Sequence, residues 1–375
     1  MTNQKIRVGV IFGGRSGEHE VSLTSAQNVM NAMDTTKYEI HPIGINKAGV
    51  WSTEVDIMAQ LKSAASLPPK LAGQIEGNKK QSLVAFLDTS LVAASEQTAQ
   101  LDVIFPVLHG PMGEDGTVQG FLELAEIPYV GCGVTGSAVA MDKAIAKDIF
   151  LAHNIPIVPH QVVKRSRLKQ DSFVILEQLE ATLTYPMFVK PANLGSSVGV
   201  TKANNRAELQ TGLVEAARYD RKIVVEQGVN AREIEVSILG NEQPKASVPG
   251  EVVPSRDFYS YAAKYIDDDS DLIIPAELSS EQATQIQEIA IKAFQVLDCA
   301  GLARVDFLMD KDTHEIYLNE VNTMPGFTAI SMYPKLWQAS GLSYSDLIDA
   351  LIDLALQRHE DNQTTAQSFD VSKAE

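Results

Sequence analysis

Short apolar runs alternate with amphipathic stretches over the first 110 residues of the chain. Residues 7–12 form an apolar run that ends at two glycines, which predicts a strand followed by a turn. Residues 38–45 and 103–108 predict two more strands. Between the first two runs, a single helix face is predicted by the three- and four-residue spacing of Ala26, Val29, Met30 and Met33. Strands that alternate with helices indicate a parallel sheet covered on both faces.

The rest of the chain has a mixed pattern. We expect helices over residues 141–153, 280–297 and 344–358, and strands over residues 186–190, 198–201, 223–226, 234–238, 303–309 and 315–321. Residues 53–100 are rich in Ala, Ser, Gln and Leu, and they predict helices and surface loops without chemistry. Residues 254–271 lack periodicity and predict a long surface loop, which in a compact domain is often functional.

Composition narrows the classes of protein that fit this pattern. The chain has 375 residues, 45% of them hydrophobic, so two or three domains of roughly 150 residues are expected. Its net charge of −17 opposes binding to nucleic-acid phosphates. No apolar run approaches the roughly 18 residues of a membrane span, and the N-terminal run is too short for a signal peptide. We expect a cytoplasmic protein without nucleic-acid or membrane partners, in which Cys132 and Cys299 are reduced thiols.

Polar side chains converge on the predicted strand pair near the C-terminus. Alternation along a strand puts Arg304 and Asp306 on one face, and Glu320 and Asn322 on one face of the next strand. If the two strands form an antiparallel hairpin, all four side chains meet. Two carboxylates and an amide oxygen are ligands suited to Mg²⁺, and Arg304 could neutralise a phosphate or an oxyanion. A solvated strand face would have the same pattern, so that alternative stays open.

Two glycine-containing segments add to this picture. Residues 190–199 join two predicted strands; glycine allows close approach of phosphates, and Ser196 and Ser197 supply hydroxyl donors. The turn at residues 322–327 follows the candidate metal strand, and its backbone N–H groups could stabilise an oxyanion. A flexible hairpin loop and an ordinary strand-ending turn are the alternatives.

Further candidates lie at other strand ends. The strand that ends at Glu226 and Gln227, with Glu233 beyond it, suggests a nucleotide clamp in which backbone groups read adenine and a carboxylate takes the ribose hydroxyls. Glu18 stands where the first helix begins and could bind a ligand ammonium; a helix-capping acid is the alternative. His109 ends an apolar strand, where open α/β sheets bind ligands, although a lone histidine is often structural.

Taken in order, seven segments resemble one family. They read GGRSGEHEVSL, LHGPMGEDGTVQG, VGCG, MDK, VKPANLGSSVGV, ARVDF and NEVNTMPGFT. Over roughly residues 6–356, apart from residues 53–100, the chain resembles the D-alanine–D-alanine ligases of the ATP-grasp superfamily. The resemblance implies an α/β fold in which an ATP-grasp fold follows a Rossmann-like N-terminal domain with a parallel sheet. It also implies ATP and Mg²⁺ (or Mn²⁺) as cofactors, with two metal ions, and a homodimer.

The resemblance divides the chain into an N-terminal substrate domain (1–131), a central ATP-grasp subdomain (132–226) and a C-terminal subdomain (227–360). The C-terminal subdomain would carry the metal and oxyanion site and a lid loop over residues 254–271. Residues 361–375 are expected to be a disordered polar tail. ATP would lie between the central and C-terminal subdomains.

The resemblance also assigns roles to residues. The nucleotide contacts it implies are Lys143 and Lys190 at the phosphates, Ser196 and Ser197 in the loop, Glu226, Gln227 and Val229 at adenine, Glu233 at the ribose and Lys264 at the transferred phosphate. The metal ligands it implies are Asp306, Glu320 and Asn322. Among the substrate contacts that the resemblance implies, Glu18 would hold the ammonium of the first substrate and would be positioned by Ser196 and Tyr265. His109 is a further implied substrate contact. Arg304 and the Gly326 amide would bind the oxyanion, and Ser331 and Met332 would bind the carboxylate of the second substrate.

The implied reaction is the ATP-dependent joining of two D-alanine molecules for peptidoglycan precursors. ATP would phosphorylate the first carboxylate, and the amine of the second D-alanine would attack the acyl phosphate. In the family a tyrosine at the position of Tyr265 goes with D-alanine as the second substrate, and a phenylalanine with D-lactate. Gly228 departs from members that carry a tryptophan there, which puts adenine stacking in doubt. The alternatives are a D-alanine–D-lactate ligase, another ATP-grasp ligase and a nicotinamide-dependent oxidoreductase.

Overall fold

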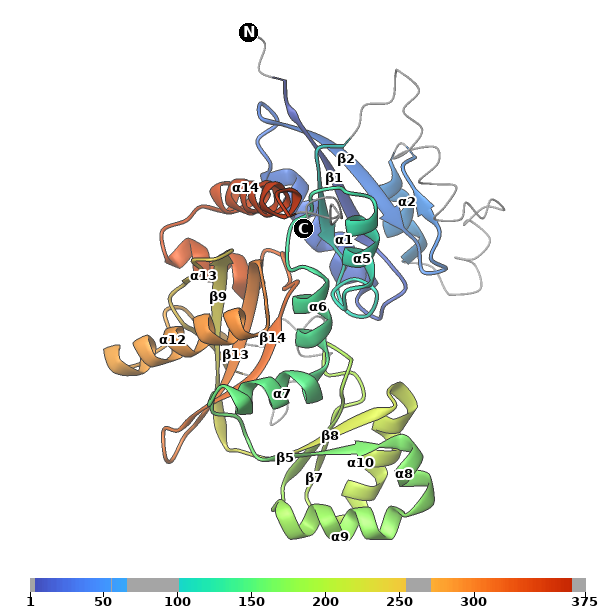
Figure 1. Cartoon of the computed structure of the whole chain (residues 1–375), viewed down its shortest axis with the longest axis vertical. Coiled ribbons are helices and arrows are strands. Elements are labelled where there is room, and N and C mark those ends of the chain that lie inside the picture. Colours follow the sequence, from blue (N-terminus) through green and yellow to red (C-terminus); the bar gives the residue numbers. More distant parts are fainter. Residues whose placement is uncertain (1–3, 55, 66–100, 254–270, 366–375) are drawn as a thin grey trace, which may run out of the picture.

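A computed structural model describes residues 4–54, 56–65, 101–253 and 271–365 of the chain. The described strands form three sheets, which follow one another along the long axis of the molecule in Figure 1. The N-terminal sheet lies at the top of that view, a six-stranded sheet in the middle and a second four-stranded sheet at the bottom. The predicted α/β fold is confirmed. Three strands of the N-terminal sheet are parallel as predicted, whereas the short strand Trp51–Ser52 at its edge pairs antiparallel, so the sheet is mixed.

The N-terminal sheet has the strand order β3-β2-β1-β4. Its strands are β1 (Ile6–Gly13), β2 (Tyr38–Ile45), β3 (Trp51–Ser52) and β4 (Val103–Val107), and its helices are α1 (His19–Ala32), α2 (Ile57–Ala65) and α5 (Thr117–Leu124). β1 is parallel to β2 and β4, and it is buried on both faces. Val8 and Val10 pack in the core with α1, whereas Ile11 packs in the core with α5. The continuous apolar run of β1 follows from this double burial.

The four-stranded sheet at the bottom is antiparallel, with the order β5-β8-β6-β7. Its strands are β5 (His160–Lys164), β6 (Met187–Pro191), β7 (Thr201–Ala203) and β8 (Lys222–Gln227), and the helices α8 (Arg165–Gln170), α9 (Ser172–Thr182) and α10 (Arg206–Tyr219) belong to the same region. Met187, Val189, Ile223 and Val225 turn one face toward these helices. Lys190 and Glu226 alternate with them and belong to the opposite face.

The six-stranded sheet is also antiparallel and has the order β12-β11-β9-β13-β14, with β10 paired to β9. Its strands are β9 (Ala231–Gly240), β10 (Lys245–Ala246), β11 (Gly250–Val253), β12 (Asp271–Ile273), β13 (Gly301–Asp310) and β14 (Ile316–Asn322). The helices α6 (Val134–Met141), α7 (Lys143–Ala152) and α12 (Ser280–Val296) share one core with it. The predicted hairpin is confirmed, because Asp306 pairs with Glu320 and Arg304 with Asn322.

The last two helices, α13 (Met332–Ala339) and α14 (Tyr344–Gln363), join the N-terminal core. Phe327, which precedes them, is fully buried and lies edge-on to Phe105 of β4, with 5.9 Å between ring centroids. Its ring also packs against the rings of Tyr333 in α13 and Tyr344 in α14, with 5.4 and 6.4 Å between ring centroids. The turn at residues 322–327 is therefore held between the first sheet and the last helices.

Three predicted boundaries were wrong. The helix expected over residues 141–153 is divided at Asp142, whose backbone is extended and whose carboxylate accepts from the Ile145 amide that begins α7. The strand expected from residue 198 starts at Thr201, because Gly199 has a φ of +71° and prolongs the loop. The last helix extends past Arg358 to Gln363, so residues 361–363 are helical and do not belong to the expected polar tail. The Arg358 guanidinium donates to the carbonyl groups of Tyr129 and Gly131 and anchors this last part of the helix.

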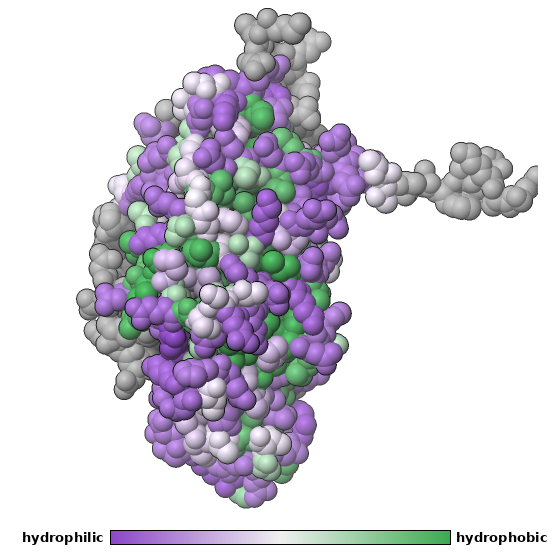
Figure 2. Space-filling model, turned by 90° about the vertical axis from the view of Figure 1, so that its left-hand side faces the viewer, coloured by the Kyte–Doolittle hydropathy of each residue, from purple (hydrophilic) through white to green (hydrophobic). Residues whose placement is uncertain are grey.

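The surface is largely polar. On the face in Figure 2 hydrophilic residues predominate, and hydrophobic residues gather mainly over its middle. Within the described ranges, no helix is long and apolar enough to cross a membrane.

Leu351 tests the contribution of α14 to the N-terminal core. Its side chain is fully buried in that core, so we expect Leu351→Ala to lower the free energy of unfolding by about 2–5 kcal/mol. Leu124→Ala is the matched control, since Leu124 is 89% exposed and its replacement should change stability by less than about 0.5 kcal/mol. Urea unfolding followed by circular dichroism measures both. Equal effects of the two substitutions would contradict this packing.

Candidate active site

Glu18 lies directly before α1 and is buried beside the glycine-rich loop. The hydroxyl of Ser196 donates a hydrogen bond to Oε1 of Glu18, although 178 positions separate the two residues. Ser196 and Ser197 have φ values of +50° and +56°, an uncommon conformation for residues other than glycine. A Cβ at Gly195 would lie 3.3 Å from Oε2 of Glu18. The loop is thus shaped so that its backbone closely approaches this carboxylate.

His109 follows β4 and is buried. Its Nδ1 lies 2.9 Å from the carbonyl oxygen of Met324, and its Nε2 lies 3.2 Å from the hydroxyl of Ser25. Burial lowers the pKa of His109, so the ring is neutral near pH 7. The structure therefore puts His109 between α1 and the turn at residues 322–327, within the same region as Glu18.

Charged residues line the β9–β13–β14 face opposite α12. Arg304 donates to both oxygens of Asp306, over 2.7 and 2.8 Å, and its Nε lies 3.0 Å from Glu235. Asn322 donates to Asp306 over 2.9 Å. Glu320, paired with Asp306 across the strands, forms an ion pair with Lys143 at 3.1 Å. The four predicted residues are therefore brought together, and two carboxylates beside an amide fit the ligand set of Mg²⁺.

No metal-binding group of three or more His, Cys, Asp or Glu side chains occurs within the described ranges. The candidate ligands are two carboxylates and an amide, Asp306, Glu320 and Asn322. Their negative charges are balanced by Arg304 and Lys143.

The candidate phosphate lysines lie close to the glycine-rich loop. Lys143 opens α7 and donates to the carbonyl of Leu194 over 2.9 Å. Burial alone would lower the pKa of Lys143, but Glu320, Glu226 and Glu114 outweigh burial and raise it. Lys190 of β6 lies 2.6 Å from Glu226 and donates to Asn319 over 3.3 Å. Both lysines thus lie beside carboxylates between the two antiparallel sheets.

The candidate adenine strand is held by its own contacts. The Gln227 side chain accepts from the Thr184 amide over 2.7 Å and donates to the Thr184 carbonyl and hydroxyl. The Gly228 amide donates to the Pro186 carbonyl over 2.8 Å, and a Cβ there would lie 2.6 Å from that oxygen. A larger residue does not fit at Gly228 without movement, so no side chain of this position can stack on adenine. Val229 and Glu233 follow and are partly exposed.

The remaining candidates stand at the start of α13. Ser331 precedes this helix, and its hydroxyl accepts from the Thr328 amide over 3.0 Å. A Cβ at Gly326 would lie 2.7 Å from the same hydroxyl oxygen, which explains a glycine there. Met332 is buried against Val252 and Leu336. Lys264 and Tyr265 lie outside the described residues.

Sequence reasoning missed four residues of this region. Nζ of Lys147 lies 3.0 Å from Glu226, and Glu114 accepts from the Gly110 amide over 2.7 Å. The other two are Glu235, which lies beside Arg304, and Asn319, which lies beside Lys190. The spacing of Lys143 and Lys147 on one helix face was the available signal for the first. Glu233 and Glu235 alternate with the apolar residues Ile234 and Val236 along β9 and so share one face of the strand, which was the signal for Glu235.

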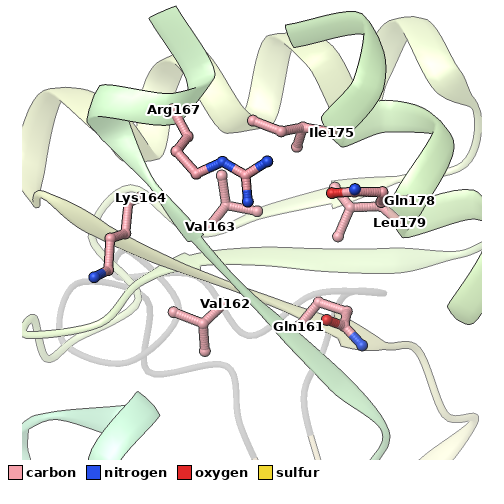
Figure 3. A pocket seen from close by; sticks show the side chains of 8 residues that line it. All are labelled: Gln161, Val162, Val163, Lys164, Arg167, Ile175, Gln178 and Leu179. Carbon is pink, nitrogen blue, oxygen red and sulfur yellow. The ribbon is translucent and has the colours of Figure 1, made fainter. Parts of the chain in front are cut away.

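Among the described residues, three cavities lie in the candidate site, near it or apart from it. A gap of about 20 Å³ lies among Glu114, Lys143, Gly195, Glu320 and Asn322, inside the candidate site. A pocket of about 290 Å³ opens at the ends of β1, β2 and β4 and includes Ser16 and His109. A third, of about 280 Å³, lies against β5, α8 and α9 (Figure 3), where Arg167 points over Val163 toward Ile175. No predicted site residue lines the third pocket.

Comparison with known proteins identifies the family. Residues 7–132 match the family model for the D-ala D-ala ligase N-terminus, and residues 149–353 match the model for the D-ala D-ala ligase C-terminus. The D-alanine–D-alanine ligase of Natranaerobius thermophilus is 49% identical, covering 98% of this chain and 100% of that one. That of Ruminiclostridium cellulolyticum is 50% identical, covering 96% and 97%.

Solved structures agree. The D-alanine–D-alanine ligase of Coxiella burnetii superposes with a TM-score of 0.80 at 37% identity, over 96% of both chains. The VanG D-Ala:D-Ser ligase of Enterococcus faecalis superposes with a TM-score of 0.78 at 34% identity, over 94% of this chain and 100% of that one. The chain therefore belongs to the D-alanine–D-alanine ligase family, whose members use ATP, generally with Mg²⁺, to form a peptide bond.

Proposed function

We propose that this chain joins two D-alanine molecules with ATP where α1, the glycine-rich loop and the β13–β14 hairpin meet. One observation carries the proposal. The loop contacts Glu18 through Ser196, and through the Leu194 carbonyl it contacts Lys143, which is itself paired with Glu320. An ammonium-binding carboxylate and a phosphate-binding lysine thus share one loop, as ligation of an amino acid through a phosphorylated carboxylate requires.

The first step activates a poor electrophile. Transfer of the γ-phosphoryl group of ATP to the carboxylate of the first D-alanine gives an acyl phosphate, and negative charge spreads over the moving group. Lys143, Lys190 and Arg304 would neutralise that charge, with Lys264 from residues 254–270. Glu18, oriented by Ser196 and Tyr265, would hold the substrate ammonium.

Asp306, Glu320 and Asn322 would hold Mg²⁺, and we propose two ions, with Mn²⁺ as a substitute. A bound Mg²⁺ neutralises charge on the phosphates of ATP. Since Asp306 and Glu320 are paired with Arg304 and Lys143, an ion competes with these pairs for the same oxygens.

In the second step the amine of the second D-alanine attacks the acyl carbon, and phosphate leaves. The tetrahedral oxyanion would lie between Arg304 and the Gly326 amide. The second substrate carboxylate would lie at Ser331 and Met332, where the first N–H groups of α13 favour an anion. His109 would support this region through its contact with the Met324 carbonyl.

The nucleotide contacts are proposed on the same basis. Ser196 and Ser197 would bind phosphates, Glu226 with the Gln227 and Val229 backbone would bind adenine, and Glu233 the ribose. Oε1 of Glu226 is buried and lies 3.0 Å from Nζ of Lys147; a carboxylate oxygen has two lone pairs, so it can accept a further donor from a ligand. We also propose a cytoplasmic homodimer that supplies D-alanyl-D-alanine to peptidoglycan precursors. Similarity to a D-Ala:D-Ser ligase makes D-serine the alternative second substrate.

The proposed reaction is tested by incubating the protein with ATP, Mg²⁺ and D-alanine. We expect D-alanine-dependent ADP and phosphate in equal amounts, with D-alanyl-D-alanine as the amide product by mass spectrometry. Parallel incubations replace half of the D-alanine with D-serine or D-lactate, and D-alanyl-D-alanine should remain the main product. Absence of D-alanine-dependent ADP sinks the proposal, and a dominant mixed product would reassign the second substrate.

Ser196→Ala tests the role given to Glu18. Loss of a hydrogen bond to a charged group costs about 1.5–3 kcal/mol, so we expect kcat/KM for D-alanine to fall roughly ten- to hundredfold, with the KM for ATP changing less. Ser166→Ala is the control, because Ser166 is exposed on α8. Unchanged kinetics of the Ser196 variant would remove the positioning role of this hydroxyl.

Glu114 gives this region a dependence on pH. Burial raises its pKa to about 8, and the neighbouring charge of Glu18 adds to the effect, while the Gly110 amide opposes it. Near neutral pH the folded protein therefore keeps a proton on Glu114 that the unfolded chain has released.

The sign of the pH dependence follows from that difference. A carboxyl group whose folded pKa is raised contributes most below its unfolded value near 4.5, and this contribution is lost as pH rises toward 8. The Glu114→Gln variant keeps an acceptor for the Gly110 amide but cannot ionise. We expect the difference in free energy of unfolding between this variant and the native chain to shift in favour of the variant by more than about 1 kcal/mol from pH 5 to pH 8.5. Urea unfolding of both proteins at the two pH values measures this difference in the free energy of unfolding. A stability difference independent of pH would contradict the raised pKa.

A further inference from the structure

Lys147 is a buried cation for which the proposed mechanism has no role. It lies on α7 one turn beyond Lys143, and only 1% of its side chain is exposed. Its Nζ is 3.0 Å from Oε1 of Glu226. Burial lowers the pKa of Lys147, and attraction to Glu226 opposes that shift. A buried ammonium without a partner is strongly destabilising, so the two residues depend on each other.

Glu226 is held between two ammonium groups. Its Oε2 lies 2.6 Å from Lys190, and its Oε1 faces Lys147. Burial would raise the pKa of Glu226, but the two lysines lower it to about 2. His160, opposite Glu226 in the register of β5 and β8, has a pKa lowered by burial and by Lys147, so it adds no charge near pH 7. Glu226 is therefore ionised at every working pH, and an ionised carboxylate only accepts hydrogen bonds.

The two lysines are not equivalent. Lys190 is 14% exposed and also contacts Asn319, and the proposed function gives its ammonium to the ATP phosphates. Lys147 is closed off from solvent, and Glu226 is its one ion-pair partner among the described residues. When phosphate competes for Lys190, Lys147 is the cation that remains for Glu226.

The hydrogen-bonding capacity of the pair is incomplete. Although their atoms lie 3.0 Å apart, neither Nζ of Lys147 nor Oε1 of Glu226 has a hydrogen-bond partner of good geometry among the described residues. An unsatisfied buried acceptor is costly. It is well suited to an incoming N–H donor, and the exocyclic amine of adenine is such a donor, whereas the carbonyl of a 6-oxo purine is an acceptor.

We propose that Lys147 is a positioning residue that holds the Glu226 carboxylate in place through their buried ion pair, so that the site takes a 6-amino purine nucleotide and rejects a 6-oxo one. The proposal rests on the function proposed above, which gives Glu226 the adenine contact. Lys147 does not touch the nucleotide; it acts through Glu226.

The test compares ATP with ITP, whose base is hypoxanthine, in D-alanine-dependent phosphate release. We expect the native chain to prefer ATP strongly, and Lys147→Met to reduce the ratio of kcat/KM for ATP to that for ITP by at least roughly tenfold, with a raised KM for ATP. Arg7→Met is the control. It breaks a two-bond ion pair with Asp102 in the N-terminal sheet, over 3.0 and 2.7 Å, so it should lower stability without changing the ratio.

A double-mutant cycle separates positioning from general destabilisation. Glu226→Gln by itself should reduce the ATP/ITP ratio, because an amide both donates and accepts. Adding Lys147→Met to it should change the ratio no further. If Lys147→Met does not fold, Lys147→Gln, which keeps a donor but no charge, replaces it and should reduce the ratio at least about threefold.

An unchanged ratio in a folded Lys147 variant, or a further fall in the double variant, overturns the role of Lys147. The proposed function fails differently, because the native chain itself would then release no phosphate from ATP in response to D-alanine.

Discussion

Charge balance between the two antiparallel sheets is the constraint on which the rest of this structure depends. Glu226, Asp306 and Glu320 are withdrawn from bulk solvent, and a withdrawn carboxylate is stable only beside a cation. Lys143 and Lys147 come from α7 and Lys190 from β6, whereas Arg304 lies on β13 with Asp306 and also pairs with Glu235 of β9. Because Lys143 pairs with Glu320 of β14 and Lys147 with Glu226 of β8, these two pairs tie α7 to both sheets. The division of the helical segment at Asp142 belongs to the same system, since Asp142 begins α7 and pairs with Lys222 of β8.

The same charges give the site its chemistry. A phosphate or a metal ion that enters between the sheets finds groups already paired, so binding exchanges one partner for another instead of creating new charge in a closed space. This exchange explains why polar residues are retained where an apolar core would pack at lower cost. The end of the site that would bind the first amino acid follows a different rule. There a hydroxyl from the glycine-rich loop orients Glu18, and the strained backbone of Ser196 brings that hydroxyl within reach.

The sequence predicted the parts of this arrangement that depend on local periodicity. Alternation along two strands was enough to bring Arg304, Asp306, Glu320 and Asn322 to one face, and the helix start was enough to locate Glu18. Lys147 was not predicted: its spacing from Lys143 puts the two lysines on one helix face, but its burial depends on β8 packing against α7. The two-way contact of Gln227 with Thr184 was missed for the same reason, since a cross-element contact leaves no mark in either segment. The end of α14 was misjudged because carbonyl groups near residue 130 anchor Arg358.

The packing of α14 has a consequence for how the protein is made. Leu347, Ile348 and Leu351 complete the core that begins with Val8 and Val10, yet a ribosome releases the N-terminal strands long before it reaches the final helix. Throughout that interval α1 covers this apolar face of the first sheet only in part, because the share that α14 covers is still missing. A message truncated before the final helix would therefore yield a product with exposed apolar core residues, even though most of the candidate site residues had been synthesised.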